Sequence, residues 1–321
     1  MITSFLYKKD KTLETDLSRA RLLQALKEPD SLLWVDLENP DEFEDEMLVE
    51  IFNFHDLAVE DCITDVSQPK ADDYDEYLFL VTHAIVLKEA QLHTIELDVF
   101  LGPNYVVTFH REPIKSIDVM RENARRKPDY YLNRGTDLLV YNILDQTVDQ
   151  YMPILEGYED VIDQIEARMF HSGDKDCLQE VIQLKRDVFH FRRIIAPQRD
   201  ALNFLTRNPN ALIKEENRIY FRDVYDHLFK IYGIVEGFQE VITGVMQAYF
   251  SYSSHLLNKT IQRMTVMATL SMPAIMIASI YGMNFQNMPE LDHRYGYLFS
   301  LALMAFLSGG MLAWMKWKKW I

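Results

Sequence analysis

The sequence predicts an α+β membrane protein with an N-terminal α/β domain, a long helical stalk and two C-terminal membrane spans. Runs rich in Val, Ile, Leu and Phe are concentrated in the first third of the chain. From about residue 136, apolar residues recur at steps of three and four, the period of a helix face. Two uncharged runs of 18 residues stand near the C-terminus. Each would be about 27 Å long as a helix, close to the thickness of a hydrocarbon core.

The composition limits the classes of partner. The 321 residues include 49 Asp and Glu against 33 Lys and Arg, a formal charge of −16 that would repel nucleic-acid phosphates. An acidic balance suits a protein that meets cations, although many soluble proteins share it. Two cysteines, Cys62 and Cys177, predict a reducing environment without a disulfide framework. The N-terminal MITSFLYKKDK lacks the apolar core of a signal peptide.

An α/β domain is predicted over residues 1–130. Its expected strands are SLLWVDLE (31–38), YLFLVTHAIVL (77–87) and the pair TIELDVFLGPNYVVTFH (94–110). Gly-Pro-Asn divides that pair and predicts a hairpin. The intervening DEFEDEMLVEIFNF has the pattern of an amphipathic helix.

Long cytoplasmic helices are predicted over 131–210, followed by a stalk helix over 211–282. The first apolar stripe comprises Leu144, Val148, Tyr151, Leu155, Tyr158, Ile162, Ile165 and Met169. The second comprises Phe221, Val224, Leu228, Ile231, Val235, Phe238, Ile242, Val245, Tyr249, Tyr252 and Leu256. No proline interrupts the chain between Pro209 and Pro273, so a helix from Glu215 to Tyr281 would measure on the order of 100 Å. Its repeat is explained equally well by a supercoil or by packing on a neighbouring helix of the same chain.

Membrane spans are predicted at 264–281 and 298–315, joined by an external loop over 283–297 and followed by a basic tail over 316–321. Two buried helices of a soluble core are the alternative, but charged and aromatic residues at the ends of both runs favour the membrane. The connecting loop holds one Arg and one His, whereas five basic residues flank the opposite ends: Lys259, Arg263, Lys316, Lys318 and Lys319. By the positive-inside rule both termini are cytoplasmic, in a cell membrane, with Trp314, Trp317 and Trp320 as interfacial anchors.

The two spans differ in polarity. Apart from Ser300, Ser308 and two glycines the second is apolar, whereas the first carries Thr265, Thr269, Ser271, Pro273 and Ser279. Polar side chains are costly against lipid, so the first helix is expected to line something and the second to face lipid. Two helices cannot enclose a polar path, so transport would require an oligomer.

Enzyme motifs are missing from the sequence. It contains no Walker A, GxSxG, GxGxxG or HExxH pattern and no CxxC pair. A metal site of His55, Cys62, His83 and His93 is conceivable, but scattered residues of these types more often pack or face solvent. The acidic runs at 41–46 and 72–76 are likewise expected to be solvated faces. An enzyme is therefore disfavoured.

Three motifs carry a resemblance to a known family. YGMNF (281–285) is followed by MPEL (288–291), HDLAVEDCITDVSQPKADDYDEYLFLV occupies 55–81, and YFRDVYDH occupies 220–227. Together they resemble the CorA family of magnesium and cobalt channels, over nearly the whole chain. The resemblance implies a homopentamer with a cytoplasmic α/β/α funnel, in which the first spans surround the pore and the second spans lie outside.

The resemblance also implies a selectivity filter at Gly282, Met283 and Asn284. Because Mg²⁺ gives up its water shell reluctantly, a ring of Asn284 amide oxygens would select the hydrated ion while binding it weakly. Gly282 would let the chain turn inward, and Met283 and Phe285 would pack to hold the turn. In the external loop, Glu290 and Asp292 would raise the local cation concentration.

Helical steps back from Asn284 give the expected pore-lining side chains. They are Asn258, Ile261, Met264, Thr265, Ala268, Met272, Ile275 and Ser279. Rings of apolar side chains such as Met272 can close a pore by dewetting. The resemblance further implies that cytoplasmic Mg²⁺ bound near Glu60 and Asp61 holds the pore shut. The stalk position expected to face them, Gln247, is not a carboxylate.

The leading hypothesis is a pentameric Mg²⁺ channel driven by membrane potential. It would also pass Co²⁺, with Ni²⁺ as a further candidate, and would need no cofactor besides Mg²⁺ as transported and regulatory ion. Its partners would be its own copies, Mg²⁺ or Co²⁺ and the lipid bilayer. The alternatives are a Zn²⁺ transporter of the related ZntB type and a two-span membrane-anchored sensor or scaffold.

Overall fold

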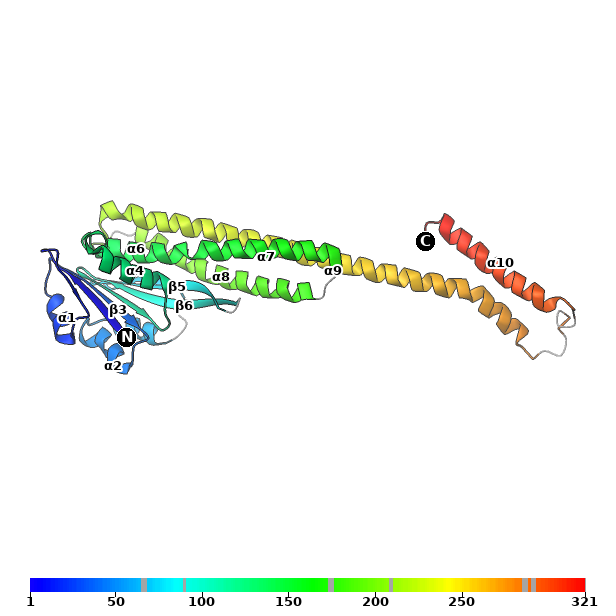
Figure 1. The fold of residues 1–321 in the computed structure, drawn as a ribbon, viewed down its shortest axis with the longest axis horizontal. Coiled ribbons are helices and arrows are strands. Elements are labelled where there is room, and N and C mark those ends of the chain that lie inside the picture. Colours follow the sequence, from blue (N-terminus) through cyan, green and yellow to red (C-terminus); the bar gives the residue numbers. More distant parts are fainter. Residues whose placement is uncertain are drawn as a thin grey trace. The chain divides into compact units, whose positions relative to one another are not determined.

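A seven-stranded mixed sheet organises the first part of the chain (Figure 1). The computed structural model describes residues 1–64, 68–88, 91–172, 176–207, 210–284, 288–289 and 293–320. The strand order is β2-β1-β3-β7-β6-β5-β4, and β3 and β7 form a parallel pair whereas the other neighbours are antiparallel. The strands are β1 (Ile2–Tyr7), β2 (Leu13–Thr15), β3 (Leu32–Glu38), β4 (Lys70–Asp73), β5 (Leu78–Lys88), β6 (Gln91–Leu101) and β7 (Tyr105–His110).

The predicted strands are present, and three others were not foreseen. β3, β5 and the β6–β7 hairpin form where the apolar runs predicted them. The strands β1, β2 and β4 escaped prediction. β2 has three residues, and β4 has the sequence KADD at the sheet edge, so neither offers an apolar run.

Helices cover both faces of the sheet, which confirms the α/β/α arrangement (Figure 1). One face carries α1 (Arg19–Ala25), α2 (Glu42–Glu50) and α3 (Asp56–Ile63). The other carries α4 (Lys115–Arg126) and α6 (Thr136–Asp149), and the short α5 (Pro128–Tyr131) packs on these two helices. Within the acidic run 41–46, Asp41 caps α2 by accepting a 2.8 Å hydrogen bond from the Glu44 amide. Both cysteines are buried and unpaired, Cys62 on α3 and Cys177 among the long helices.

The long helices are α7 (Tyr151–Ser172), α8 (Asp176–Arg207) and α9 (Arg218–Tyr281), the last preceded by the short 3₁₀ turn η1 (Glu215–Asn217). The first predicted stripe is buried from Leu144 to Ile165 but runs over two helices, because the chain turns at Gln150 between α6 and α7. The side chain of Met169 lies outside the described residues.

The stalk stripe packs on the chain's own helices over much of its length. Its members from Phe221 to Val245 are buried or half-buried, and Ile242 and Val245 line a small cavity with residues of α7 and α8. Packing on a neighbouring helix therefore accounts for the repeat in this part. Tyr252 and Leu256, further along, are exposed in the chain.

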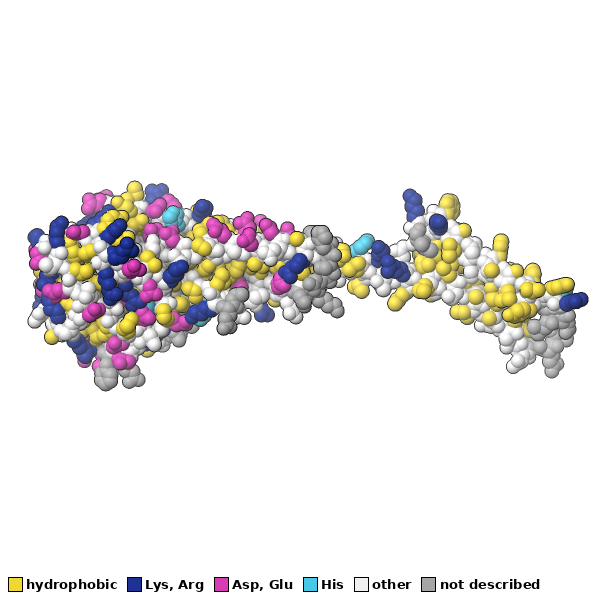
Figure 2. Space-filling view, viewed as in Figure 1, with side chains coloured by type: hydrophobic (Ala, Val, Ile, Leu, Met, Phe, Trp, Pro, Cys, Tyr) yellow, Lys and Arg dark blue, Asp and Glu magenta, His cyan; other side chains and the backbone are white. Residues whose placement is uncertain are grey.

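Contacts divide the chain into Met1–Val245 and Met246–Ile321, with α9 contributing to both units. The second unit contains the rest of α9 and α10 (Gly296–Trp317). Two helical segments, Glu215–Tyr281 and Gly296–Trp317, are long and apolar enough to cross a membrane. Hydrophobic side chains dominate the surface of this unit, and basic groups gather toward its ends (Figure 2).

Candidate ion pathway and cation clusters

One face of α9 in the second unit packs on α10. Ile277 is 8% exposed, and the positions one and two turns before it, Pro273 and Leu270, are half-buried. The Ser308 hydroxyl of α10 donates a 3.0 Å hydrogen bond to the Leu270 carbonyl oxygen. This contact fixes which side of α9 faces its partner helix.

The predicted pore-lining side chains lie on the other side of α9. At about 100° per residue they centre roughly half a turn from the covered face. All of them are exposed in the chain: Asn258, Ile261, Met264, Thr265, Ala268, Met272, Ile275 and Ser279. Met272 and Ile275 are 67% and 63% exposed, so a substantial apolar surface is left uncovered by α10. The assignment of these residues to a pore stays a prediction.

Three hydroxyl groups of the first span bond to their own helix. Thr265 donates to the Ile261 carbonyl at 2.9 Å, Thr269 to Thr265 at 2.7 Å and Ser271 to Met267 at 3.0 Å. A hydroxyl bonded one turn back leaves no unpaired donor. These three hydroxyl groups are therefore satisfied within α9, and the expectation that the first span lines a path stays a prediction.

The GMN residues follow the end of α9. The Gly282 amide donates to the Ala278 carbonyl at 2.9 Å, and a methyl group added at Gly282 would lie 3.1 Å from that oxygen. This close approach favours glycine. Asn284 is exposed, and Met283 is 49% exposed rather than packed within the chain. Phe285, Glu290 and Asp292 lie outside the described residues.

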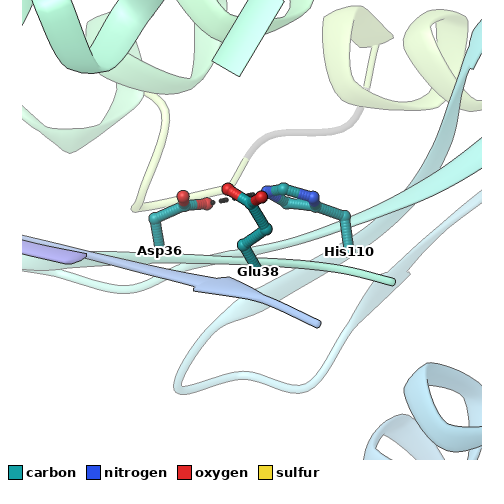
Figure 3. Close-up of side chains that lie close together, drawn as sticks. All are labelled: Asp36, Glu38 and His110. Atoms are coloured by element: carbon teal, nitrogen blue, oxygen red, sulfur yellow. Dashed lines mark ion pairs between the residues drawn. The ribbon is translucent and has the colours of Figure 1, made fainter. Parts of the chain in front are cut away.

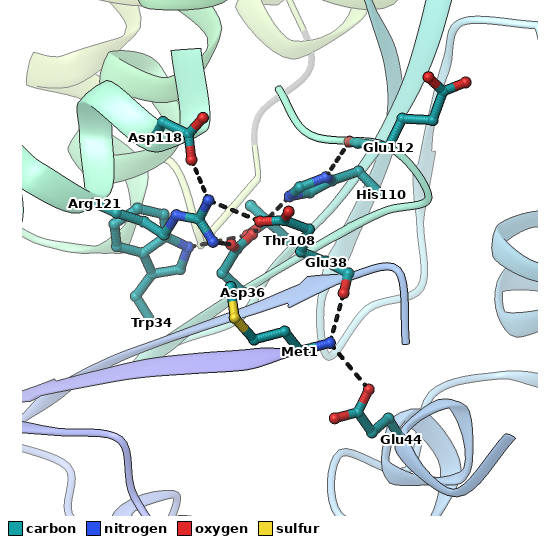
Figure 4. Close-up of polar contacts among 10 residues, drawn as sticks. All are labelled: Met1, Trp34, Asp36, Glu38, Glu44, Thr108, His110, Glu112, Asp118 and Arg121. Carbon is teal, nitrogen blue, oxygen red and sulfur yellow. Dashed lines mark hydrogen bonds and ion pairs between the residues drawn. The ribbon is translucent and has the colours of Figure 1, made fainter. Parts of the chain in front are cut away.

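A first group of possible metal ligands, Asp36, Glu38 and His110, lies where β3 and β7 pair (Figure 3). The Arg121 guanidinium donates to Asp36 at 3.1 Å and to Glu38 at 2.8 Å, and also pairs with Asp118 (Figure 4). Thr108 donates its hydroxyl hydrogen bond to Asp36. Arg121 pairs with all three carboxylates and His110 lies beside Asp36, so the arrangement is an ion-pair network inside the fold rather than a cation site.

His110 belongs to the same network. Its Nε2 lies 3.3 Å from Asp36 Oδ1, and the imidazole is fully buried. Burial disfavours the imidazolium, but the negative charge of the nearby Asp36 and the 2.7 Å hydrogen bond from Nδ1 to the Glu112 carbonyl oxygen outweigh it and raise the pKa of His110. Because its pKa is raised in the folded state, protonation of His110 stabilises the fold, fully so below the ordinary histidine pKa of about 6.5. This stabilisation is lost as the pH rises through the pKa that His110 has in the folded state.

His110→Gln is therefore expected to destabilise the protein more at pH 5.5 than at pH 8.5. Loss of a charge-assisted hydrogen bond should cost roughly 1.5–3 kcal/mol at the lower pH. Thermal unfolding of the full chain at both pH values measures the difference. His93→Gln is the control, because His93 pairs with Glu112 while 43% exposed. An equal loss for His110→Gln at the two pH values would contradict a charged, paired imidazole.

A second group joins α6 to α9 within the first unit. Candidate ligand atoms of Asp145, Asp149 and His227 all lie within 4.8 Å of one another. Burial, together with the charges of Asp149 and Asp223, raises the pKa of the half-buried Asp145 carboxyl. No Lys or Arg pairs with these carboxylates among the described residues, in contrast to the Arg121 network. Carboxylates that repel one another and have no basic partner suit a divalent cation, which oxygen ligands bind.

The motif YFRDVYDH (220–227) contains Asp223 and His227, but no metal site was predicted from these residues or from Asp145 and Asp149. Asp145 and Asp149 are four apart on α6, and Asp223 and His227 are four apart on α9, so each pair lies on one helix face. That spacing was the available signal. Only the packing of α6 beside α9 shows that the two pairs share a site.

The residues expected to hold regulatory metal have other contacts. Lys70 donates to Asp61 at 2.7 Å, so a cation at Asp61 would compete with an ammonium group. Glu60 is exposed on α3, and Gln247 belongs to the second unit. His55 caps α3 by accepting from the Leu57 amide, consistent with a packing role.

Comparison with known proteins decides the family. The family model described as "CorA-like Mg2+ transporter protein" matches residues 29–318. The chain belongs to the CorA family. It is therefore a member of a family of membrane transporters rather than an enzyme, and it is a CorA-like divalent metal ion transporter.

Individual relatives agree with the family assignment. YfjQ of Bacillus subtilis (strain 168) is 37% identical over 310 residues, 96% of each chain. The cobalt/magnesium transport protein CorA of Thermotoga maritima is 34% identical over 275 residues, 85% of this chain and 78% of the relative. The complete structure of the CorA magnesium transporter of Methanocaldococcus jannaschii has a TM-score of 0.85 at 22% identity, covering 99% and 98% of the two chains. At that identity the last comparison shows the fold alone.

Proposed function

We propose that the chain assembles as a homopentamer that conducts hydrated Mg²⁺ into the cytoplasm. Co²⁺ would also pass, Ni²⁺ is a further candidate, and both termini would be cytoplasmic. The observation that carries this proposal is the exposed face of α9 opposite α10, which combines Met272 and Ile275 with small and polar residues. Copies of α9 around an axis would cover that face and enclose a path.

Each part of the pathway has a physical role. Asn284 stands just beyond the end of α9, so its copies would form a ring of amide oxygens at the outer mouth. Such a ring can accept hydrogen bonds from the water shell of Mg²⁺ without stripping it. Met272 and Ile275 would form apolar constrictions below. A divalent cation gains about 4.6 kcal/mol per 100 mV of inside-negative potential, so no nucleotide site is required.

Regulation by cytoplasmic Mg²⁺ would use the carboxylates of the first unit. Asp145, Asp149 and His227 offer converging ligand atoms, with Asp223 contributing charge. Glu60 and Asp61 are the alternative site, weakened by Lys70. Cation binding at either place would couple internal Mg²⁺ concentration to the stalk helix.

Uptake by proteoliposomes tests the proposed function. Mg²⁺ influx is expected to increase strongly when a K⁺ gradient with valinomycin sets an inside-negative potential, because the potential acts on both ionic charges. Absence of flux at any potential would favour the sensor or scaffold alternative. Direct competition between ions decides the transported class: preferential Zn²⁺ flux would favour the ZntB-type alternative.

A further inference from the structure

A recess lies between α9 and the C-terminal end of α10 in the second unit. It has a volume of about 560 Å³ and is lined by Lys259, Gln262, Arg263, Val266, Met267, Lys319 and Trp320. Its α9 residues continue, one turn at a time, the face that α10 covers at Leu270. The recess therefore opens on the side of α9 opposite the predicted pore-lining residues.

The backbone after α10 closes one wall of this recess. Lys319 has a φ of 59°, a left-handed conformation in which glycine is the usual residue. The Trp320 amide then donates a 2.9 Å hydrogen bond back to Met315, and the Gln262 side chain donates to the Trp320 carbonyl. This turn brings the Lys319–Trp320 end of the chain against the turn of α9 that carries Lys259 and Arg263.

In the sequence of this unit, no Asp or Glu stands close to the basic residues of the recess. From residue 246 onward the sequence contains two acids, Glu290 and Asp292, both in the loop at the other end of the helices. No ion pair involves Lys259, Arg263 or Lys319 in the part of the chain that the structure describes. Meanwhile Val266, Met267 and Trp320 give the recess an apolar floor.

We propose that this recess binds the phosphate headgroup of an anionic phospholipid from the adjoining leaflet. Three cations and the Gln262 amide match a phosphodiester, and Val266, Met267 and Trp320 match the start of its acyl chains. Basic pockets between membrane helices suit anionic headgroups, and a soluble phosphate would leave the apolar floor unmatched. The inference requires membrane insertion but not ion conduction.

Lipid titration followed by native mass spectrometry of the purified full-length protein tests the site. Phosphatidylglycerol is the probe, with phosphatidylcholine as the zwitterionic comparison. The triple variant K259Q/R263Q/K319Q is expected to bind phosphatidylglycerol about 100-fold more weakly, equivalent to about 3 kcal/mol at 1.4 kcal/mol per decade. Phosphatidylcholine binding should change little.

The matched control is K316Q/K318Q, which removes charges from the same helix end outside the recess. It should retain most of the affinity for phosphatidylglycerol. Equal weakening by the control variant, or equal binding of the two lipids by the wild type, would overturn the proposal in favour of diffuse attraction. Competition by millimolar glycerol phosphate would overturn it in favour of a free phosphate site. The single variants K259Q, R263Q and K319Q, each expected to weaken binding severalfold, provide the same test if the triple variant does not fold.

Discussion

Asn284→Ala is expected to abolish Mg²⁺ uptake by proteoliposomes while leaving the protein folded and assembled. Asn284 is exposed beyond the last turn of α9 and supports no described contact within the chain, so its removal should not disturb the helices. The alanine would remove one amide acceptor from every subunit of the proposed ring. Because hydrogen bonds involving charged groups contribute about 1.5–3 kcal/mol each, a loss of at least tenfold in flux is expected.

The control for this change is Asn287→Ala, which removes an amide from the same loop outside the GMN tripeptide. Its position lies beyond the described residues, but the sequence places it in the same connecting segment. Flux should persist in that variant. Size-exclusion chromatography with light scattering checks that both variants assemble as the wild type does. Normal flux in a correctly assembled Asn284→Ala protein would remove Asn284 from the filter.

Substitutions in the group formed by Asp145, Asp149 and His227, here called the α6–α9 cluster, are expected to leave Mg²⁺ conduction intact while weakening its inhibition by internal Mg²⁺. Wild-type flux should fall as Mg²⁺ inside the vesicles rises. Asp145→Asn combined with His227→Gln removes two candidate ligands while nearly preserving side-chain size. Replacing even a residue that only hydrogen-bonds to a metal ligand weakens metal binding by roughly 10–100-fold, so half-closure should require at least about tenfold more internal Mg²⁺.

Asp163→Asn is the control for that experiment, because Asp163 is an exposed acid on α7 outside the cluster. It should respond to internal Mg²⁺ as the wild type does. The alternative site is tested in the same vesicles with Glu60→Gln combined with Asp61→Asn. If this pair shifts the response and the cluster variant does not, the regulatory cation binds at α3 instead.

The sequence was most informative where one local pattern determines one element. The β6–β7 hairpin has apolar strands around Gly-Pro-Asn, and its two strands pair as expected. β4 was missed because KADD has no strand pattern and forms only by pairing with β5. The apolar stripe that begins at Leu144 indicated one helix face but runs over α6 and α7, because such a stripe can continue past a helix end such as that at Gln150.

Sites assembled from distant elements were beyond sequence reasoning. Arg121 meets Asp36 across 85 positions, and His227 meets Asp145 only because α6 and α9 pack together. The predicted pore face is a different case. Helical period alone placed its residues on one side of α9, and the structure adds that α10 covers the other side. The position of Asn284 relative to other copies depends on assembly, which one chain does not specify.

The burial of both native thiols makes the chain suited to cysteine labelling. Cys62 and Cys177 are 5% and 0% exposed, and burial raises the pKa of the Cys62 thiol well above its ordinary value. Maleimides react with accessible thiolates, so the folded wild type should label slowly. A cysteine substituted for Met272 would then be the reactive thiol. Its labelling by reagents added to either side of the bilayer would report whether the proposed pore is open or closed at this position.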